Sequence, residues 1–316
     1  MSLQSSVARI DFHFSSVLSG WTEQLRDMLT SASNELMQYV ATERLYRLGR
    51  PPHRDQFVLK GALKVMVWQA LFPRPTRDID LLARMDNAVQ DVTATMRDIC
   101  EVAVPDDGLR FAAETVAGER IMEAADYAGV RVRFRAFLGN ARIPMQVDVG
   151  FGDAVTPDPS VVRWPTLLDL PAPEVQGYSQ ESTIAEKVQI MVRLGEINSR
   201  MKDFFDVWLL GARASFDGEI LASALQATFR QRGTVIPVSP VAFSDAFGGD
   251  PERQVQWEAF LRRHRVNEKT GVPTTLTEVI RLIAGFLGPV LEAVSEGRRF
   301  KKRWPPGGLW TSSAQT

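Results

Sequence analysis

The most informative segment of this chain, residues 57–84, reads FVLKGALKVMVWQALFPRPTRDIDLLAR. The apolar run at 57–59 predicts a short strand, and Gly61 ends it. Residues 63–72 have the apolar spacing of a helix, which the prolines that follow bring to an end. Residues 78–83 then place acidic and aliphatic side chains in alternation, a pattern typical of a strand. The segment therefore predicts a strand, a glycine turn, a helix and a second strand that begins with two acids.

The two acids of this second strand, Asp78 and Asp80, are the candidate catalytic carboxylates. Residues two apart on a strand point to the same side, with Cα atoms roughly 6.6 Å apart. Two carboxylates placed in this way can share a pair of divalent cations about 3.5–4 Å apart, the arrangement for in-line phosphoryl displacement. Mg²⁺ suits this role because it takes one or two carboxylates together with substrate phosphates and waters. Mn²⁺ accepts similar ligands.

A nucleotide-binding turn is predicted after the first strand, at Lys60, Gly61 and Ala62. Gly61 lets the backbone approach phosphates closely because it has no Cβ. Amides at the start of the following helix can meet the anionic groups. A third carboxylate, Asp148, lies between two valines in PMQVDV, residues 144–149, on another predicted strand. We expect it to lie beside the first pair, where it completes a metal site or acts as the base.

Each of these features has a simpler explanation when it is taken alone. A D-x-D pair is common on surfaces and in turns, and a lone glycine usually marks a turn. The combination of a strand, a glycine, a helix, a D-x-D strand and a later strand acid is much rarer. That combination carries the prediction of a phosphoryl-transfer site, and a binding module whose D-x-D pair is structural stays open as the non-enzyme alternative.

The remainder of the chain divides into a β-rich part and a helical part. After a predicted helix at 87–104, strand patterns recur at 110–116, 129–138 and 143–149. Residues 152–177 are rich in Pro, Asp and Gly and predict a linker or an irregular surface segment. The helices predicted after residue 178 are 181–196, 199–213, 217–231, 251–264 and 275–296. We expect an α/β (α+β) fold with two domains, residues 1–170 with the N-terminal helices and the sheet, and residues 171–316, a helical domain that completes the active-site cleft.

Composition narrows the class of protein. A chain with 45% hydrophobic and 24% charged residues is globular rather than disordered. The single cysteine, Cys100, excludes an intramolecular disulfide and a multi-cysteine zinc site, and it fits a reducing compartment. No apolar run is long enough for a transmembrane helix and no secretion signal is evident, so we expect a cytoplasmic protein without a membrane partner.

The formal net charge of −1 means that a nucleic-acid partner would have to be held by local basic patches. Arg131, Arg133 and Arg135 alternate with apolar residues on a predicted strand, so they share one face. That face is turned either to a polyanion or simply to solvent. Basic clusters at 262–265 and 298–303 are candidate RNA contacts or solvated helix ends.

These motifs resemble the AbiEii/AbiGii-type (MenT-like) nucleotidyltransferase toxin family, within the polymerase-β-like nucleotidyltransferase superfamily. The matching residues are Gly61-Ala62, Asp78-Ile79-Asp80 and Asp148, and Ala62 stands where the pattern often has serine or glycine. The resemblance implies a polymerase-β-like lobe with a mixed sheet followed by a helical lobe. It also implies an NTP as co-substrate.

The resemblance extends into the helical part through an A-E-K segment, residues 185–187, and a K-D-x-x-D block, residues 202–206. It implies that Lys187 contacts the triphosphate and that Asp203 has a catalytic role. Lys202 and Asp206 are implied to help bind the nucleotide. The simpler explanations are a lysine that extends past an apolar stripe to water, and acids that complement the dipole at a helix start.

By resemblance, such proteins transfer a nucleotide from an NTP, in some members to the 3′ end of tRNA, and they are often toxins paired with an antitoxin. We therefore expect a metal-dependent nucleotidyltransferase with RNA as acceptor and a cognate antitoxin as partner. Transfer to a protein or a small molecule is the alternative within the same chemistry.

Overall fold

The computed structural model describes residues 39–61, 78–105, 107–123, 127–166, 170–264, 266 and 271–312. Its contacts divide the chain into two compact units. Unit 1 consists of the chain up to Gly152 together with Ser160–Gly177, whereas unit 2 consists of Asp153–Pro159 and the chain from Tyr178 onward. That residues 1–170 and 171–316 fold as two separate domains stays a prediction. The helix predicted at 63–72 lies outside the described residues.

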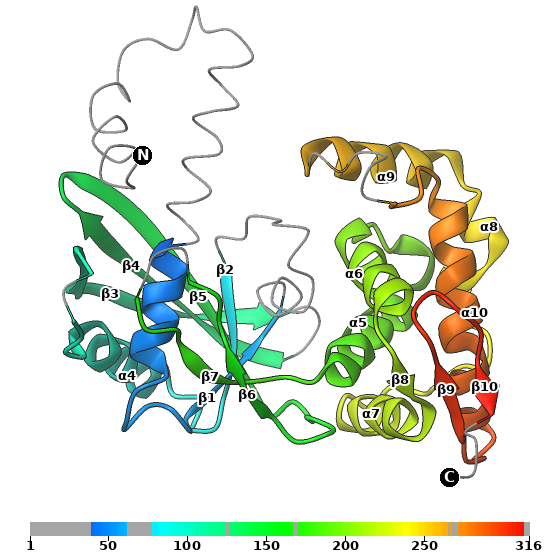
Figure 1. The fold of residues 1–316 in the computed structure, drawn as a ribbon, viewed down its shortest axis with the longest axis horizontal. Helices are drawn as coiled ribbons and strands as arrows, with labels where there is room; N and C mark the ends of the chain where they lie inside the picture. Colours follow the sequence, from blue (N-terminus) through cyan, green and yellow to red (C-terminus); the bar gives the residue numbers. More distant parts are fainter. Residues whose placement is uncertain are drawn as a thin grey trace, which may run out of the picture. The chain divides into compact units, whose positions relative to one another are not determined.

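Unit 1 is built on a seven-stranded sheet with the strand order β3-β4-β5-β2-β1-β7-β6 (Figure 1). Two neighbouring pairs, β1 with β7 and β2 with β5, are parallel, and the other pairs are antiparallel. The sheet is therefore mixed, which confirms the predicted fold class. The strands are β1 (Phe57–Lys60), β2 (Asp78–Ala83), β3 (Leu109–Glu123), β4 (Tyr127–Leu138), β5 (Ala141–Phe151), β6 (Ser160–Arg163) and β7 (Glu174–Gly177).

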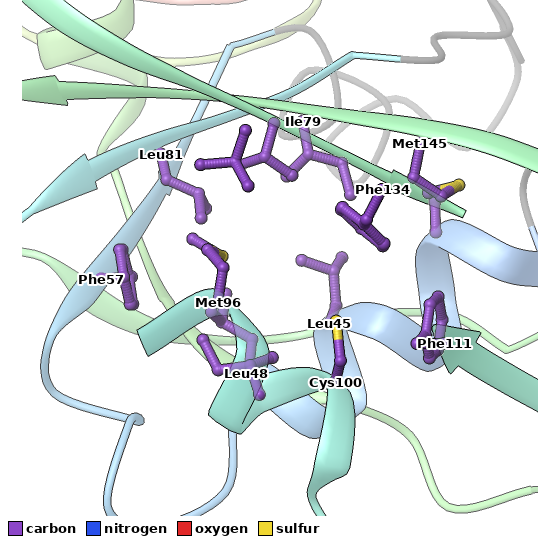
Figure 2. Close-up of a cluster of buried hydrophobic side chains, with 14 of the residues drawn as sticks. Leu45, Leu48, Phe57, Ile79, Leu81, Met96, Cys100, Phe111, Phe134 and Met145 are labelled. Carbon is purple, nitrogen blue, oxygen red and sulfur yellow. The ribbon is translucent and has the colours of Figure 1, made fainter. Parts of the chain in front are cut away.

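One face of this sheet carries the apolar core. The helix α4 (Val89–Glu101) and a helical segment at 39–48 contribute buried side chains to the same cluster as the strands. Figure 2 shows Ile79 and Leu81 of β2 packed with residues from both helical segments, among them Leu45 and Met96. Because side chains alternate along a strand, the polar residues of the central strands lie on the opposite face. The core thus fixes which side of the sheet the acids occupy.

The prediction of a linker or irregular segment at 152–177 was wrong for eight of its residues. β6 and β7 form an antiparallel pair, and β7 joins the sheet beside β1 in parallel, with Gly177 opposite Leu59. The prolines and most of the acids lie in the loops on either side of these strands. Strands of four residues in a turn-rich segment are too short to produce a recognisable alternation.

Unit 2 is helical, as predicted, with a small three-stranded sheet of order β10-β9-β8 (Figure 1). Ser179, Asp217, Asp250 and Thr275 accept backbone N–H bonds at the starts of the four helices that follow them, which explains where those helices begin. No helix in the described ranges has the length and apolar character to cross a membrane. The elements are α5 (Gln180–Leu194), η1 (Gly195–Ile197), α6 (Met201–Arg213), β8 (Phe216–Asp217), α7 (Gly218–Gln231), η2 (Val241–Phe243), α8 (Asp245–Gly248), α9 (Pro251–Arg263), α10 (Leu276–Ser295), β9 (Lys302–Trp304) and β10 (Thr311–Ser312).

Candidate active site

A row of charged residues crosses the middle of the unit 1 sheet, on the face opposite the apolar core. Lys60 of β1 pairs in register with Asp80 of β2. Asp80 pairs in turn with Asp148 of β5, and Asp148 pairs with Arg131 of β4. Residues in register on neighbouring strands share a face, and the strands lie about 4.8 Å apart. The fold therefore places two acids side by side, with a base on either flank.

Gly61 lies directly against the carboxylate of Asp80. Its backbone φ of +76° falls in the left-handed region that favours glycine. A Cβ built on Gly61 would lie 2.0 Å from Asp80 Oδ2 and 2.9 Å from Asp80 Cβ. The missing side chain at position 61 is therefore what leaves room for the second acid of the D-x-D pair.

Arg131 holds Asp148 through a two-point contact. The Nε of Arg131 donates to Asp148 Oδ1 at 2.7 Å, and Nη2 donates to Oδ2 at 2.7 Å. Gln146 Nε2 also donates to Oδ2, at 3.5 Å. The Asp148 side chain is 14% exposed and that of Arg131 is 30% exposed. Because a guanidinium fork matches both carboxylate oxygens, it fixes the orientation of the acid as well as its position.

The residues on this face fit a hard divalent cation by their chemistry. Asp80 and Asp148 supply carboxylate oxygens, which Mg²⁺ and Mn²⁺ accept as ligands. Gly61 leaves room for the Asp80 carboxylate at the position that a Cβ would otherwise fill. Within the described residues no group of three or more acid, His or Cys side chains is arranged to hold a metal ion. The described side chains thus provide two acids, and Asp78 occupies β2 at the register position opposite Gln146.

A second group of predicted residues meets inside unit 2. Lys187 of α5 places its Nζ 2.8 Å from Asp203 Oδ1 and 2.8 Å from Asp206 Oδ2, both on α6. Arg200, which precedes α6, donates from Nε to the other oxygen of Asp203 at 2.6 Å. The Lys187 side chain is 10% exposed, and those of Asp203 and Asp206 are 2% exposed. The A-E-K and K-D-x-x-D segments therefore form one buried ion cluster that ties α5 to α6.

Opposite charges keep this cluster ionised despite its burial. Burial alone would lower the pKa of Lys187, but the attraction of Asp203 and Asp206 outweighs it and holds that pKa above its usual value. Burial alone would raise the pKa of Asp203, but Lys187 and Arg200 outweigh it and lower the pKa to about 2. Two acids and two bases balance one another, and all of them except Arg200, whose side chain is 42% exposed, are largely shielded from water.

The predicted site residues thus fall into two groups. Lys60, Gly61, Asp80 and Asp148 meet on the polar face of the unit 1 sheet, whereas Lys187, Asp203 and Asp206 meet within unit 2. Lys202 is a half-buried residue of α6. Ala62 lies outside the described residues.

Sequence reasoning missed a further buried network in unit 2. Arg232 Nη2 donates to Asp153 Oδ1 at 3.0 Å and lies 3.4 Å from Glu186 Oε1. Its Nη1 donates to Gln189 Oε1 at 3.0 Å. These contacts hold the segment Asp153–Pro159 against the helices of unit 2. Arg232 and Asp153 are 79 residues apart in sequence, so no local sequence pattern predicts this ion pair.

Two solved structures resemble the chain at low sequence identity. One is a crystal structure of a candidate nucleotidyltransferase from H. pylori, with 13% identity and a TM-score of 0.43, covering 88% of this chain and 97% of that one. The other is the crystal structure of JHP933 from Helicobacter pylori, with 12% identity and a TM-score of 0.43, covering 88% of this chain and 94% of that one. No curated protein sequence matches the chain.

Family comparison gives a match over most of the chain. The family described as "Nucleotidyl transferase AbiEii toxin, Type IV TA system" matches residues 43–279. This range contains both groups of site residues, from Lys60 to Asp206. The chain therefore belongs to the AbiEii nucleotidyl transferase toxin family of type IV toxin–antitoxin systems, and it is a nucleotidyltransferase.

Proposed function

We propose that this protein uses a divalent cation, Mg²⁺ or Mn²⁺, to transfer a nucleotide from an NTP to an RNA acceptor such as the 3′ end of tRNA. Family membership gives nucleotidyl transfer and a toxin role, whereas the cation and the acceptor are the proposal. The observation that supports it best is the packing of Gly61 against Asp80, with Asp148 in register beside it on one face of the sheet.

In this proposal Asp78, Asp80 and Asp148 are the acids that serve the cation. A bound cation supplies positive charge next to the reacting phosphate. Lys60, in register with Asp80, and the backbone at Gly61 orient the phosphates of the NTP. The acceptor hydroxyl attacks the α-phosphate and pyrophosphate leaves. The hydroxyl proton passes to Asp148 or, where Asp148 binds the cation, to water.

Lys187 is proposed to contact the triphosphate while it stays in its ion cluster. A lysine ammonium has three N–H donors, and its partners among the described residues are the two carboxylates at 2.8 Å. The third donor is the one that the proposal assigns to a phosphate oxygen. Asp203 and Asp206 then act by holding Lys187 charged and in place, and Lys202 on the same helix is a further candidate for nucleotide contact.

The direct test is labelling of RNA by the purified protein. Each α-labelled NTP is incubated with Mg²⁺, total cellular RNA and the protein, and the products are separated on a denaturing gel. We expect one RNA size class to be labelled, and the label to disappear with EDTA or with Asp80→Asn. Asp98→Asn, which changes an exposed acid on α4, is the matched control and keeps full labelling. Label that appears on protein or on a small molecule instead would move the assignment to the alternative acceptors.

The toxin role gives a test in cells. We propose that expression of the protein alone arrests bacterial growth, because RNA whose 3′ end has been extended accumulates even when the enzyme is slow. The arrest depends on Asp80, and co-expression of the cognate antitoxin relieves it. Arrest that persists with Asp80→Ala would show that nucleotidyl transfer is not its cause.

A further inference from the structure

The polar face of the central strands brings two acids together, so their mutual repulsion has to be offset by positive charge. Asp80 and Asp148 are in register on neighbouring strands, whose backbones lie about 4.8 Å apart. Two carboxylates at adjacent register positions on one face repel one another, and the repulsion is strong where water is partly excluded. The strands on either side present Lys60 and Arg131 at the adjoining register positions. The two acids can therefore lie together before any cation arrives.

Of the two flanking bases, Arg131 has the more specific geometry. Its guanidinium reaches both oxygens of Asp148 at 2.7 Å, in a half-buried position. Arg133 lies two residues further along β4, and its Nη1 contacts Glu119 Oε1 at 2.5 Å. Both members of that second pair are about half exposed, at 53% and 51%. The same strand thus offers one arginine fixed on a site acid and one arginine in an ordinary surface ion pair.

We infer that Arg131 is a positioning residue of the nucleotidyl-transfer site: it orients Asp148 through the two-point contact and supplies the positive charge that a divalent cation must compete with. This inference rests on the proposed function, because it takes Asp80 and Asp148 as acids that serve the cation. It assigns Arg131 a role beyond solvent exposure or polyanion contact, the two explanations that its strand pattern allows.

Removing the guanidinium should change cation binding and turnover in opposite directions. The site becomes more negative without Arg131, so a divalent cation binds more tightly, on the order of tenfold for the loss of one positive charge near a partly buried site. Asp148 loses its fixed orientation at the same time, and loss of such an outer partner costs about 10–100-fold in turnover. A residue with a merely structural role would weaken both properties or neither.

The experiment uses the full chain and four variants, one of which, Asp80→Asn, tests whether Mn²⁺ binds at the proposed site. Mn²⁺ is titrated without nucleotide, and free Mn²⁺ is followed by its EPR signal, while kcat is measured separately at saturating Mn²⁺. Arg131→Met should lower the half-saturating Mn²⁺ concentration and lower kcat. Arg131→Lys keeps the charge without the fork, so it should bind Mn²⁺ like the wild type and still have a reduced kcat. Arg133→Met is the control on the same strand and should change neither quantity more than about twofold.

The outcomes separate this inference from the proposed function. If the wild type binds no Mn²⁺, or if Asp80→Asn binds Mn²⁺ as tightly as the wild type does, the proposed cation site itself fails. If it does bind Mn²⁺, but Arg131→Met behaves like Arg133→Met or binds Mn²⁺ more weakly, the positioning role of Arg131 is wrong. Should Arg131→Met not fold, a wild-type kcat in Arg131→Lys overturns the inference equally well.

Discussion

Replacing Gly61 with alanine should damage the site through a single added methyl group. The new Cβ would lie 2.0 Å from Asp80 Oδ2, whereas ordinary contacts begin at 3.4 Å, so the carboxylate has to move by about 1.4 Å. Rotation of the side chain is not sufficient, because Asp80 Cβ itself would be 2.9 Å away. A displacement of this size at a reacting group costs on the order of 100-fold in rate.

The same substitution should also cost stability, from two separable sources. An alanine at a φ of +76° is strained by about 1–2 kcal/mol. The overlap with Asp80 adds about 1–3 kcal/mol, the usual cost of overpacking. Gly139→Ala is the matched control, because Gly139 has a φ of +57° and a Cβ added there would meet nothing within 4 Å. It should show the strain alone.

Urea unfolding of five proteins measures these terms: the wild type, Gly139→Ala, Gly61→Ala, Asp80→Ala and the double variant of the last two. In the Asp80→Ala background most of the collision is gone, so Gly61→Ala should cost little more than Gly139→Ala does in the wild type. Nucleotidyl transfer is measured in parallel for both glycine variants. If Gly61→Ala is no less stable than Gly139→Ala and keeps its transfer rate within threefold, Gly61 does not shape the position of Asp80.

Three further predictions concern buried charges. Lys187→Met leaves two buried carboxylates without their shared cation and should lower the free energy of unfolding by about 3–5 kcal/mol in urea titrations; unchanged stability would contradict the charge balance described for this cluster. Asp203 has its pKa lowered from 3.8 to about 2, so it stabilises the protein above pH 3.8 by about 2 kcal/mol, and this contribution should vanish as the pH falls toward 2 and be absent in Asp203→Asn. Burial, with the nearby charge of Asp107, raises the pKa of Glu43 from 4.5 to about 7, so stability should decline as the pH rises from 4.5 through 7. In thermal melts at pH 8, Glu43→Gln should remove this decline and be more stable than the wild type by about 1–3 kcal/mol, and equal melting temperatures for the two proteins would rule out the effect.

Local sequence was sufficient for most elements of the fold. β1 and β2 follow directly from the apolar and alternating patterns at 57–59 and 78–83, and the five long helices of unit 2 lie within a few residues of their predicted limits. β6 and β7 escaped prediction because each has four residues, and β7 is recognisable only by its pairing with β1. The mixed character of the sheet was expected from the family resemblance rather than from the strand patterns.

The candidate site likewise contains residues that the sequence indicated and partner residues that it did not. The D-x-D acids and Gly61 were visible as a motif, since their spacing along the chain is itself the signal. The partners were not visible: Arg131 shares its alternating pattern with Arg133 and Arg135, and nothing in that pattern distinguishes the one that meets Asp148. The register of β4 against β5 makes the distinction, because a shift by two residues would bring Arg133 opposite Asp148 in place of Arg131.

Residue types at fixed spacings, with the family resemblance that they carry, were therefore enough to predict the class of enzyme, its candidate acids and its helical second part, because those signals depend on neighbours within a few residues. Strand register and long-range contact were needed to place Asp148 beside Asp80, to bring Arg131 onto Asp148, and to join Lys187 with Asp203 and Asp206. These contacts link residues 16 to 68 positions apart, and their energies arise only when burial and charge are combined in space.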